Sequence, residues 1–363
     1  MLLKKSMLLK KSMLSKKSNS EKTKNTVATS VDVARLACVS QTTVSRVFSG
    51  KNIVKQSTVD IVLEAASELG YRPNAIARSL SNRRTNIVAV VSVNSTQPFY
   101  SSIVNGISNK LTHAGKQVMF FPTDFEVGGI FQQVLQYKVD AMLIVSAAVS
   151  SEITEECSRI SLPVVILTRI VKSPHVFSIC SDNQRAARGV ADHLVKRGYR
   201  RFAYIGSARR LSDVSFDRQK GFTERLSELG FDGVRIAYGN YTYDSGRTAA
   251  RDLLNSESAT SERRAIFASN DLMAMGAMDA ARYEYGLSVP GDLAVVGFDA
   301  IEEGSWSSYS LTTVEQPIDM MLDTARAYLA IKLDGLDEGI LDERELDAGL
   351  KLFQCGIIER ATT

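Results

Sequence analysis

The sequence predicts an α/β protein in which a small all-helical region precedes a larger body of doubly wound parallel sheet. Residues 29–70 place apolar side chains at helical spacing between capping signals. From residue 86 onward, short apolar runs typical of buried strands alternate with helix-length stretches. With 363 residues, 44% of them apolar and 23% charged, the chain is long enough for two or three domains with a large core.

The charges are divided unevenly along the chain. Residues 1–84 hold 16 Lys and Arg against 5 Asp and Glu, whereas residues 85–363 hold 28 against 35. A basic head on an acidic body is typical of nucleic-acid binding. More than half of the basic excess, however, comes from residues 1–24, which hold eight lysines and one glutamate.

Those first residues repeat one hexad three times, as MLLKKS, MLLKKS and MLSKKS. A six-residue period turns the apolar pair by about 120° each time, so no helical face forms. The apolar stretches are also far shorter than the core of a signal peptide. We therefore predict a disordered basic tail over residues 1–26, which could touch phosphates without sequence preference.

Three short helices are predicted next. The first follows TSVD, where Thr29 and Asp32 form a capping-box pattern. In the second, residues 40–48, Ser40 can cap, and the valines face inward while polar side chains face outward. The third, residues 57–70, is closed by Gly70. Its expected apolar face is Val59, Val62, Leu63, Ala66 and Leu69.

The polar face of the second helix, SQTTVSRVF, has two interpretations. Glutamine, threonine and arginine make hydrogen bonds to base edges and phosphates, so a helix held by its neighbours could enter a major groove. A generic three-helix bundle with a solvated face would show the same pattern. The pattern alone leaves both open.

Residues 32–80, DVARLACVSQTTVSRVFSGKNIVKQSTVDIVLEAASELGYRPNAIARSL, resemble the headpiece and hinge of the LacI/GalR family of transcriptional regulators. That family's pattern runs DVA-x-x-A-G-VS-x-x-TVSR-V-x-N-G, then ELGY-x-PN-x-x-AR-x-L. Two positions depart from it. Cys38 replaces a glycine in a turn that favours left-handed backbone, and Lys55 replaces the serine that caps the third helix.

The resemblance implies a DNA-binding role for particular side chains. Gln41, Thr42 and Arg46 would read bases, and Thr43 and Ser45 would hold phosphates. The headpiece is expected over residues 27–72.

A hinge helix and linker are expected over residues 73–85. Its single turn or two would be too short for stability in water, so it would fold only when two hinges pair over DNA. There Asn74 would help to cap, Ala77 would allow close approach, and Leu80 would enter a base step from the minor groove.

The body, residues 86–360, shows seven apolar strand-like runs. They are NIVAVVSV (86–93), KQVMFF (116–121), AMLIV (141–145), LPVVIL (162–167), RFAYIG (201–206), AIFAS (265–269) and LAVVGF (293–298). Such alternation predicts doubly wound parallel sheet, with two sheets expected. It resembles the two-lobed effector domain of the same family, which is similar to type I periplasmic binding proteins and closes around a ligand. The overall resemblance covers about nine-tenths of the chain.

Sequence motifs of catalysis are missing. The glycines of YIGSAR and VVGFDA are not G-x-G-x-x-G, and neither a P-loop nor a G-x-S-x-G serine elbow occurs. The three histidines are scattered, and the four cysteines form no C-x-x-C pair, which suits a reduced cytosol. We predict no enzyme, no cofactor and no metal.

Candidate ligand-binding residues follow the strands, where open α/β sheets hold ligands. Phe99 and Tyr100 could form a stacking wall, and Tyr241 could stack on a ring. Arg218 and Asp299 form a donor–acceptor pair suited to vicinal hydroxyls. By resemblance Asn270 also contacts the effector, although it could simply cap a helix. Thr168 stands where many sugar-binding relatives carry Asp or Asn, which disfavours a plain hexose.

Taken together, these features predict a cytoplasmic, sequence-specific DNA-binding transcriptional regulator that acts as a repressor and is controlled by a sugar, sugar derivative or nucleoside-like effector. A homodimer is expected because operators mirror a protein two-fold axis. The chain ends at IIERATT without a leucine heptad, so no tetramer-forming coiled coil is expected. The alternatives are a periplasmic-type sugar-binding protein and a sugar-metabolising enzyme. The sequence contains no run of about 18 apolar residues, so no membrane partner is expected.

Overall fold

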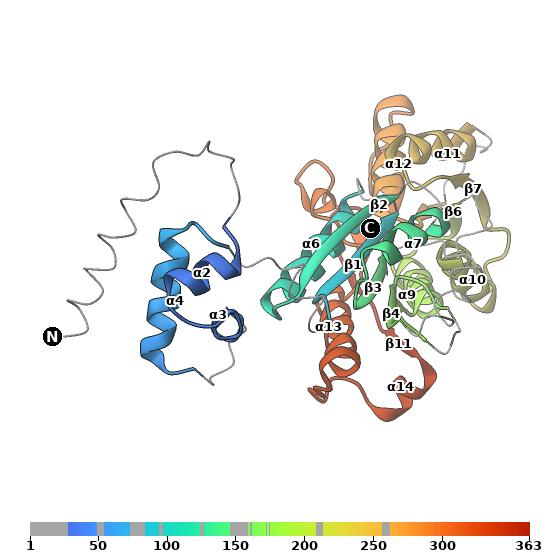
Figure 1. Ribbon diagram of the computed structural model, residues 1–363. Helices are drawn as coiled ribbons and strands as arrows, with labels where there is room; N and C mark the ends of the chain where they lie inside the picture. Colours follow the sequence, from blue (N-terminus) through green and yellow to red (C-terminus); the bar gives the residue numbers. More distant parts are fainter. Residues whose placement is uncertain are drawn as a thin grey trace. The chain divides into compact units, whose positions relative to one another are not determined.

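The computed structural model describes residues 28–48, 54–72, 84–93, 97–123, 127–145, 159, 162–171, 173, 175–207, 213–255 and 262–363. Two compact units divide between Arg83 and Arg84 (Figure 1). The predicted basic tail and the hinge residues Asn74, Ala77 and Leu80 lie outside the described residues.

The N-terminal unit contains the three predicted helices, α2 (Ser30–Leu36), α3 (Gln41–Phe48) and α4 (Gln56–Glu68). The predicted capping box is confirmed: Thr29 Oγ1 accepts a hydrogen bond from Asp32 N, and Asp32 Oδ2 accepts one from Thr29 N. Ser40 Oγ accepts from Thr43 N at 3.1 Å and so caps the start of α3. These local bonds fix where each short helix begins.

The core of this unit is small. Its buried members are Val33, Ala34, Ala37, Val44, Val62, Ala65 and Ala66. The prediction that Leu63 and Leu69 belong to this core is wrong, because they are 48% and 36% exposed. The third helix instead turns its alanines inward, which lets three short helices approach closely.

Both departures from the headpiece pattern have visible local consequences. Cys38 has φ +54°, the left-handed conformation predicted for the glycine position that it occupies. Lys55 stands at the N-cap of α4 and makes no side-chain capping bond. The headpiece therefore keeps its fold without two local stabilising features.

The second unit is built on two six-stranded sheets, which confirms the predicted doubly wound architecture. The first has the order β11-β5-β4-β3-β1-β2, all neighbours parallel. Its strands are β1 (Ile87–Val93), β2 (Gln117–Thr123), β3 (Ala141–Val145), β4 (Val164–Leu167), β5 (Val176–Ser181) and β11 (Leu350–Phe353).

The second sheet has the order β12-β10-β9-β8-β6-β7 and is parallel except for β12, which runs antiparallel to β10. Its strands are β6 (Arg201–Ser207), β7 (Arg235–Gly239), β8 (Arg264–Ala268), β9 (Leu293–Phe298), β10 (Thr312–Glu315) and β12 (Gly356–Ile358). All seven predicted strands are present. The five others are short, polar or at a sheet edge, so their apolar signal is weak.

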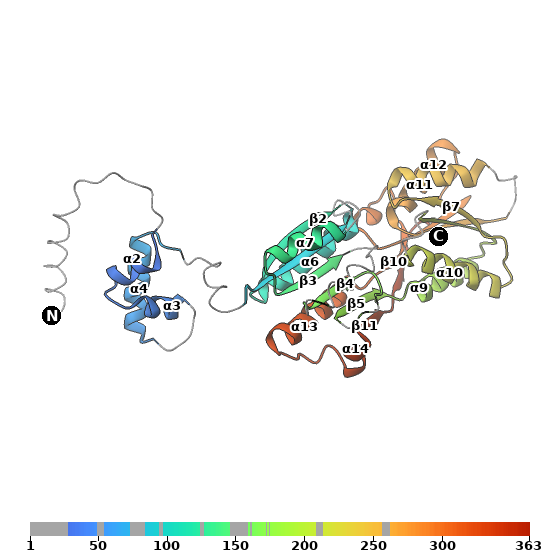
Figure 2. The same ribbon diagram turned by 45° about the vertical axis from the view of Figure 1, so that its right-hand side comes forward.

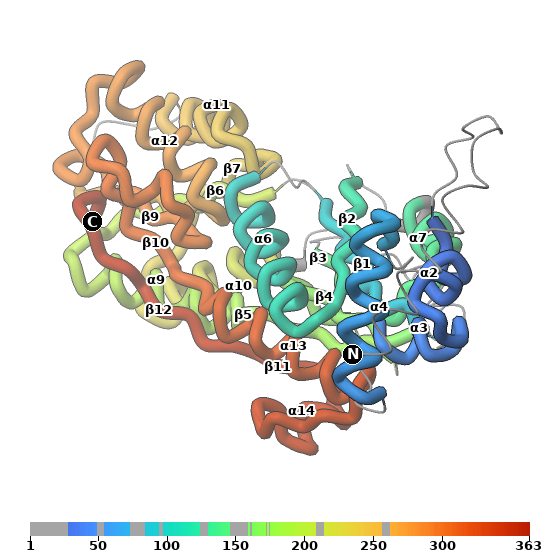
Figure 3. Tube along the Cα trace, turned by 60° about the vertical axis from the view of Figure 1, so that its left-hand side comes forward, coloured from blue at the N-terminus to red at the C-terminus, as the bar shows by residue number. Residues whose placement is uncertain are grey.

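Helices cover the faces of each sheet, which defines a first and a second lobe (Figure 2). The first lobe carries α6 (Pro98–His113), α7 (Val127–Gln136), α13 (Ile318–Asp334) and α14 (Glu343–Ala348). The second carries α9 (Asn183–Lys196), α10 (Asp213–Glu228), α11 (Tyr243–Asn255), α12 (Asp271–Glu284) and the 3-10 helix η1 (Glu302–Ser305). Helices α6 and α13 lie side by side, although they are far apart in sequence (Figure 3).

The chain passes between the lobes three times. It crosses after β5 at Asp182, after β10 at Gln316 and Pro317, and after β11 at Gln354 and Cys355. These three crossovers bring the carboxyl ends of β5 and β10 together, beside the carboxyl ends of the other parallel strands in both lobes. Over the described ranges, no helix combines the length and apolarity needed to cross a bilayer.

Candidate functional site

Two regions carry the polar side chains singled out by the sequence. On α3, Gln41, Thr42, Ser45 and Arg46 are exposed, while Val44 between them is fully buried. Their spacing places the four on one face of the helix. The helix therefore presents a continuous row of hydrogen-bonding groups to solvent.

Two members of this helix also make contacts within the headpiece. Gln41 Nε2 donates to Ser30 Oγ at 3.0 Å, which ties the start of α3 to α2. Thr43 is half-buried, and its hydroxyl lies 2.9 Å from Ser40 Oγ. Its hydroxyl thus already belongs to the helix cap, and a phosphate would have to share it.

The second region centres on Arg218 in α10, which is only 5% exposed. Its Nε donates to Asn183 Oδ1 at 2.8 Å and its Nη1 to the Ser269 carbonyl oxygen. The guanidinium lies 3.5 Å from the centre of the Phe298 ring. A buried arginine needs such partners, since an unpaired buried charge is costly.

A glycine allows this arrangement. Gly221 follows Arg218 by one helical turn, where α10 packs against the start of α9. A Cβ there would lie 2.2 Å from the backbone oxygen of Gln184. Because Gly221 has no side chain, α9 and α10 come close enough for Asn183 to reach Arg218.

Asp299 follows β9 and is 8% exposed. Its Oδ1 accepts a hydrogen bond from Gln316 Nε2 at 2.7 Å and lies 3.9 Å from Arg218 Nη1. Burial raises the pKa of Asp299 to about 7, against the opposing attraction of Arg218. Within the described residues both contacts fall on Oδ1, which leaves Oδ2 for a hydroxyl or amine donor.

Asp271, the neighbour in sequence of Asn270, is fully buried and structural. It accepts hydrogen bonds from the Thr313 hydroxyl and the Ile301 backbone amide, and burial raises its pKa to about 6. These bonds hold the loop after β9 against α12 and so position Asp299.

Asn270 caps α12, as the simpler interpretation proposed: its Oδ1 accepts from Met273 N at 3.0 Å. Its Nδ2 donates to the Tyr241 carbonyl oxygen at 3.1 Å. With 5% exposure, Asn270 holds the loop that carries Tyr241.

The aromatic candidates come from both lobes. Phe99 is 8% exposed and belongs to the hydrophobic core, whereas Tyr100, at 5.4 Å from it between ring centres, is half-buried. Burial, followed by Tyr241 and Asp299, raises the pKa of Tyr100. Tyr100 thus lies close enough to Tyr241, Asp299 and Arg218 to be influenced by their charges, and its ring packs edge-on against that of Phe99.

Strained backbone marks the same place. Thr168, Tyr241, Asp299 and Ala300 have φ values of +71°, +68°, +119° and +55°, in the region that side chains with a Cβ avoid. Three of them are candidates chosen from the sequence. Such strain concentrates at ligand-binding sites, where tertiary contacts impose it.

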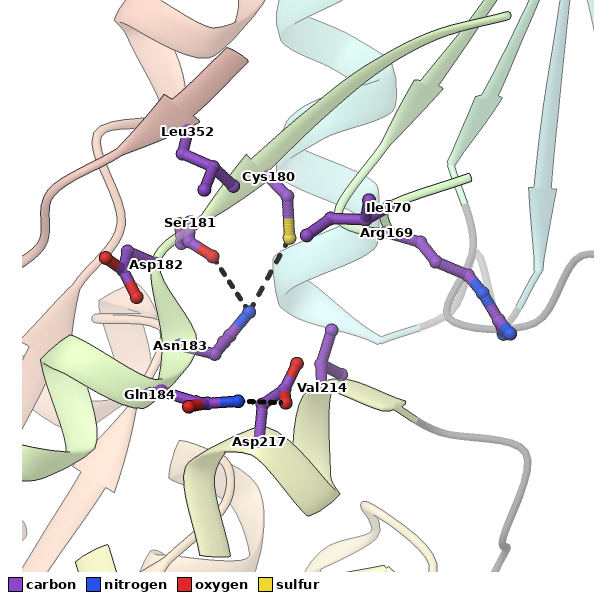
Figure 4. Close-up of a pocket in the computed structure, with 10 residues that line it drawn as sticks. All are labelled: Arg169, Ile170, Cys180, Ser181, Asp182, Asn183, Gln184, Val214, Asp217 and Leu352. Atoms are coloured by element: carbon purple, nitrogen blue, oxygen red, sulfur yellow. Dashed lines mark hydrogen bonds between the residues drawn. The ribbon is translucent and has the colours of Figure 1, made fainter. Parts of the chain in front are cut away.

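A pocket of about 210 Å³ opens beside this cluster (Figure 4). Its lining is Arg169, Ile170, Cys180, Ser181, Asp182, Asn183, Gln184, Val214, Asp217 and Leu352. Figure 4 shows Asn183 at its centre, donating to the Ser181 carbonyl oxygen and to Cys180 Sγ. The lining comes from both lobes and the first crossover. Asn183 connects the pocket to Arg218, whereas Tyr100, Tyr241, Arg218 and Asp299 do not themselves line it.

Sequence reasoning missed Asn183, Gln316 and Phe298, although all three contact the predicted pair. Asn183 follows β5, which was not predicted as a strand because its serines and cysteine interrupt the apolar run. Gln316 follows β10, which has only four residues. Over the ranges that the structure describes, no cluster of three or more His, Cys, Asp or Glu could hold a metal ion.

Comparison with known proteins follows the same division of the chain. Residues 29–74 match the family model "Bacterial regulatory proteins, lacI family", and residues 191–363 match "Periplasmic binding protein-like domain". Catabolite control protein A of Priestia megaterium is 33% identical over 293 residues, which cover 79% of this chain and 87% of that protein.

Solved structures agree with these matches. The lac repressor dimer bound to operator and the anti-inducer ONPF superposes with a TM-score of 0.81 over 93% of this chain and 99% of that chain, at 24% identity. The complex of the transcriptional regulator CelR with cellobiose gives 0.66 over 93% and 100%, at 28% identity.

A lacI-type helix-turn-helix headpiece and a periplasmic-binding-protein-like body together define a DNA-binding transcriptional regulator. The chain belongs to the LacI family. The resemblance and the fold class expected from the sequence are thereby confirmed. The lac repressor and the transcriptional regulator CelR are, by their names, regulators rather than enzymes.

Proposed function

We propose that this regulator is a repressor whose affinity for operator DNA is set by a small molecule bound between Tyr100, Tyr241, Arg218 and Asp299. The observation that carries this proposal is the buried Arg218–Asp299 pair at 3.9 Å, with the half-buried Tyr100 close enough to be influenced by both charges. A few convergent polar groups beside aromatic side chains are the usual composition of a small-ligand site.

The ligand best suited to these four side chains is uncharged and carries hydroxyl groups or a flat polar ring. Arg218 and Asp299 balance each other's charge when both are ionised, so a charged ligand would leave an excess. Aromatic faces stack on sugar or base rings. The cellobiose in the CelR complex supports a saccharide, whereas Thr168 in place of an acidic or amide residue argues against a plain hexose.

On the DNA side, Gln41, Thr42 and Arg46 would contact base edges and Thr43 and Ser45 phosphates. The exposed row on α3 supports this assignment. One headpiece reads only a half-site, so a homodimer would bind a two-fold operator. Binding would take place in the cytoplasm, where bacterial DNA lies.

The segment around Leu80 would couple the two units. Leu80→Ala should weaken operator binding and reduce DNA bending, because an apolar wedge between bases opens the minor groove. Gel mobility of circularly permuted operator fragments would measure the bend. An unchanged bend together with a lower melting temperature would assign Leu80 to packing within the protein.

Selection of bound sequences from random DNA, with and without pooled metabolites, tests the function as a whole. We expect enrichment of a two-fold symmetric sequence that changes in yield when an effector is present. Thermal shift with ribose, other sugars and nucleobases would then identify the class. Failure to enrich any sequence would overturn the DNA-binding part, and enrichment that no metabolite alters would overturn the ligand control.

A further inference from the structure

The ligand site and the lobe crossovers share one buried polar ring. Ser181 ends β5 and its hydroxyl donates to Gln316 Oε1 at 2.7 Å, while Gln316 Nε2 donates to Asp299 Oδ1 at 2.7 Å. Arg218 connects Asp299 to Asn183, and Asn183 Nδ2 returns to the Ser181 carbonyl oxygen at 3.0 Å. All five residues are at most 8% exposed.

Gln316 is the member that joins separate parts of the chain. It lies on the second crossover, Ser181 immediately precedes the first, and Asp299 follows β9 in the second lobe. The first crossover is in turn bonded to the third, since Asp182 N donates to the Phe353 carbonyl oxygen at 2.8 Å. One amide side chain therefore links the Asp299 carboxylate to the segments that connect the lobes.

The chemistry of an amide gives this link a direction. Because Oε1 accepts from Ser181, Nε2 faces Asp299 and must donate, and its bond is stronger when Asp299 is ionised. Hydrogen bonds in series also polarise one another in a buried setting. A donor that a ligand offers to Oδ2 favours the ionised carboxylate and so tightens the bond from Gln316.

We propose that Gln316 is a positioning residue that transmits the state of Asp299 to the lobe crossovers through Ser181. Ligand binding at Asp299 then changes how firmly the first and second crossovers are joined. This role rests on the ligand site proposed above. The connection between Asp299 and the crossovers can nevertheless be tested without any ligand.

A double-mutant cycle, repeated in two backgrounds of the full chain, tests this link. Protonation of Asp299, controlled by pH, takes the place of ligand binding in the experiment. Ser181→Ala, Asp299→Asn and their double variant are melted in the wild-type and in the Gln316→Met background, at pH 5.5 and pH 8.5. With Gln316 present, the melting-temperature shifts of Ser181→Ala and Asp299→Asn should be non-additive by about 2–4 °C at pH 8.5. This coupling is expected although the two side chains make no direct contact. In the Gln316→Met background they should add.

The pH comparison separates a relay from simple packing. At pH 5.5 Asp299 is protonated, so the non-additivity should fall by at least half. The charged or titratable groups around the ring include Arg218 of α10, Asp271 of α12, Tyr100 of α6, Tyr241 before α11, Cys180 of β5 and Cys355 of the third crossover. These groups are present in every variant compared, so their own titration largely cancels when the melting-temperature shifts are subtracted.

Gln354→Met is the matched control, because Gln354 lies exposed on the third crossover. It should leave the Ser181–Asp299 coupling unchanged. Additivity in the wild-type background, or equal coupling after Gln316→Met, would overturn the role of Gln316.

A second measurement covers the case in which Gln316→Met does not fold. Asp299→Asn alone should speed hydrogen exchange at the backbone amides of Asp182 and Ile318, which bond to Phe353 and Gln316 at the crossovers. Neither amide contacts Asp299. Exchange rates equal to those of the wild type would also overturn the link, whether or not the cleft binds an effector.

Discussion

The headpiece and the body place their functional side chains in opposite environments. On α3, the row from Gln41 to Arg46 is exposed above a core of seven buried residues. In the body, Arg218 and Asp299 are themselves buried and lie beside large apolar clusters. The DNA-reading surface proposed for α3 needs only a scaffold beneath it, whereas the ligand site proposed for the body requires polar groups inside the protein.

This difference predicts that mutations in the two regions fail in different ways. A change in the exposed row, away from the Gln41–Ser30 bond, should alter recognition much more than stability. A change in the buried pair should alter both, because each partner leaves the other unsatisfied.

The largest effect is expected for Arg218→Ala. Removal of the guanidinium leaves Asp299 buried without its partner and opens space beside Phe298, at a cost of about 3–5 kcal/mol in the free energy of unfolding. Urea denaturation of the full chain would measure it. Arg225→Ala, on the same helix but paired on the surface with Asp192 and Glu228, should change stability little. Equal effects of the two variants would refute the contrast between buried and exposed sites.

The next effect is expected for Arg46→Ala. A guanidinium reading a base contributes roughly 1–3 kcal/mol of discrimination, so operator preference should fall while salt-sensitive, non-specific binding persists. Fluorescence anisotropy against operator and scrambled DNA would measure the ratio. The melting temperature should fall much less than it does for Arg218→Ala. Arg35→Ala, whose side chain is 76% exposed in α2 and paired with Asp32, serves as the control. A specificity unaffected by Arg46→Ala would argue that α3 does not read bases.

A smaller effect should accompany a change of pH. The pKa of Asp299 is raised by burial from an ordinary value of 3.8 to about 7. Its contribution to stability is thus fully present below pH about 4 and is lost as pH rises to about 7, by up to roughly 1.4 kcal/mol per pH unit. Asp299→Asn should flatten this slope, measured by urea denaturation between pH 5 and pH 8. Asp271, with its pKa raised to about 6, should leave a residual slope below that value. An unchanged slope would mean that Asp299 stays ionised throughout.

The smallest effect is expected for Cys38→Gly. The left-handed φ of +54° costs a residue with a Cβ about 1 kcal/mol, part of which glycine loses again to its greater freedom in the unfolded chain. Slower hydrogen exchange at headpiece amides of the full chain would report the gain. Faster exchange would instead assign the Cys38 side chain a packing role.

Much of this architecture was predictable from the order of the residues. Local capping chemistry at Thr29 and Asp32, and long apolar runs such as Ile87–Val93, act over a few neighbouring residues and can therefore be recognised in a single chain. The polar face of α3 was visible for the same reason. The short and edge strands β7, β10 and β12 were not, because pairing with a neighbouring strand stabilises them more than their own composition does.

The candidate ligand site likewise contains residues that the sequence predicted and contacts that only the tertiary structure decided. Arg218 and Asp299 could be chosen from sequence, but their 3.9 Å separation depends on two elements 81 positions apart in the chain packing in one lobe. Asn183 and Gln316 became functional candidates only when the crossovers brought them beside that pair. The exposure of Leu63 was likewise decided by how α4 rotates against α2 and α3. Periodicity and capping are local properties, whereas burial, pairing and a raised pKa arise only when distant segments exclude water together.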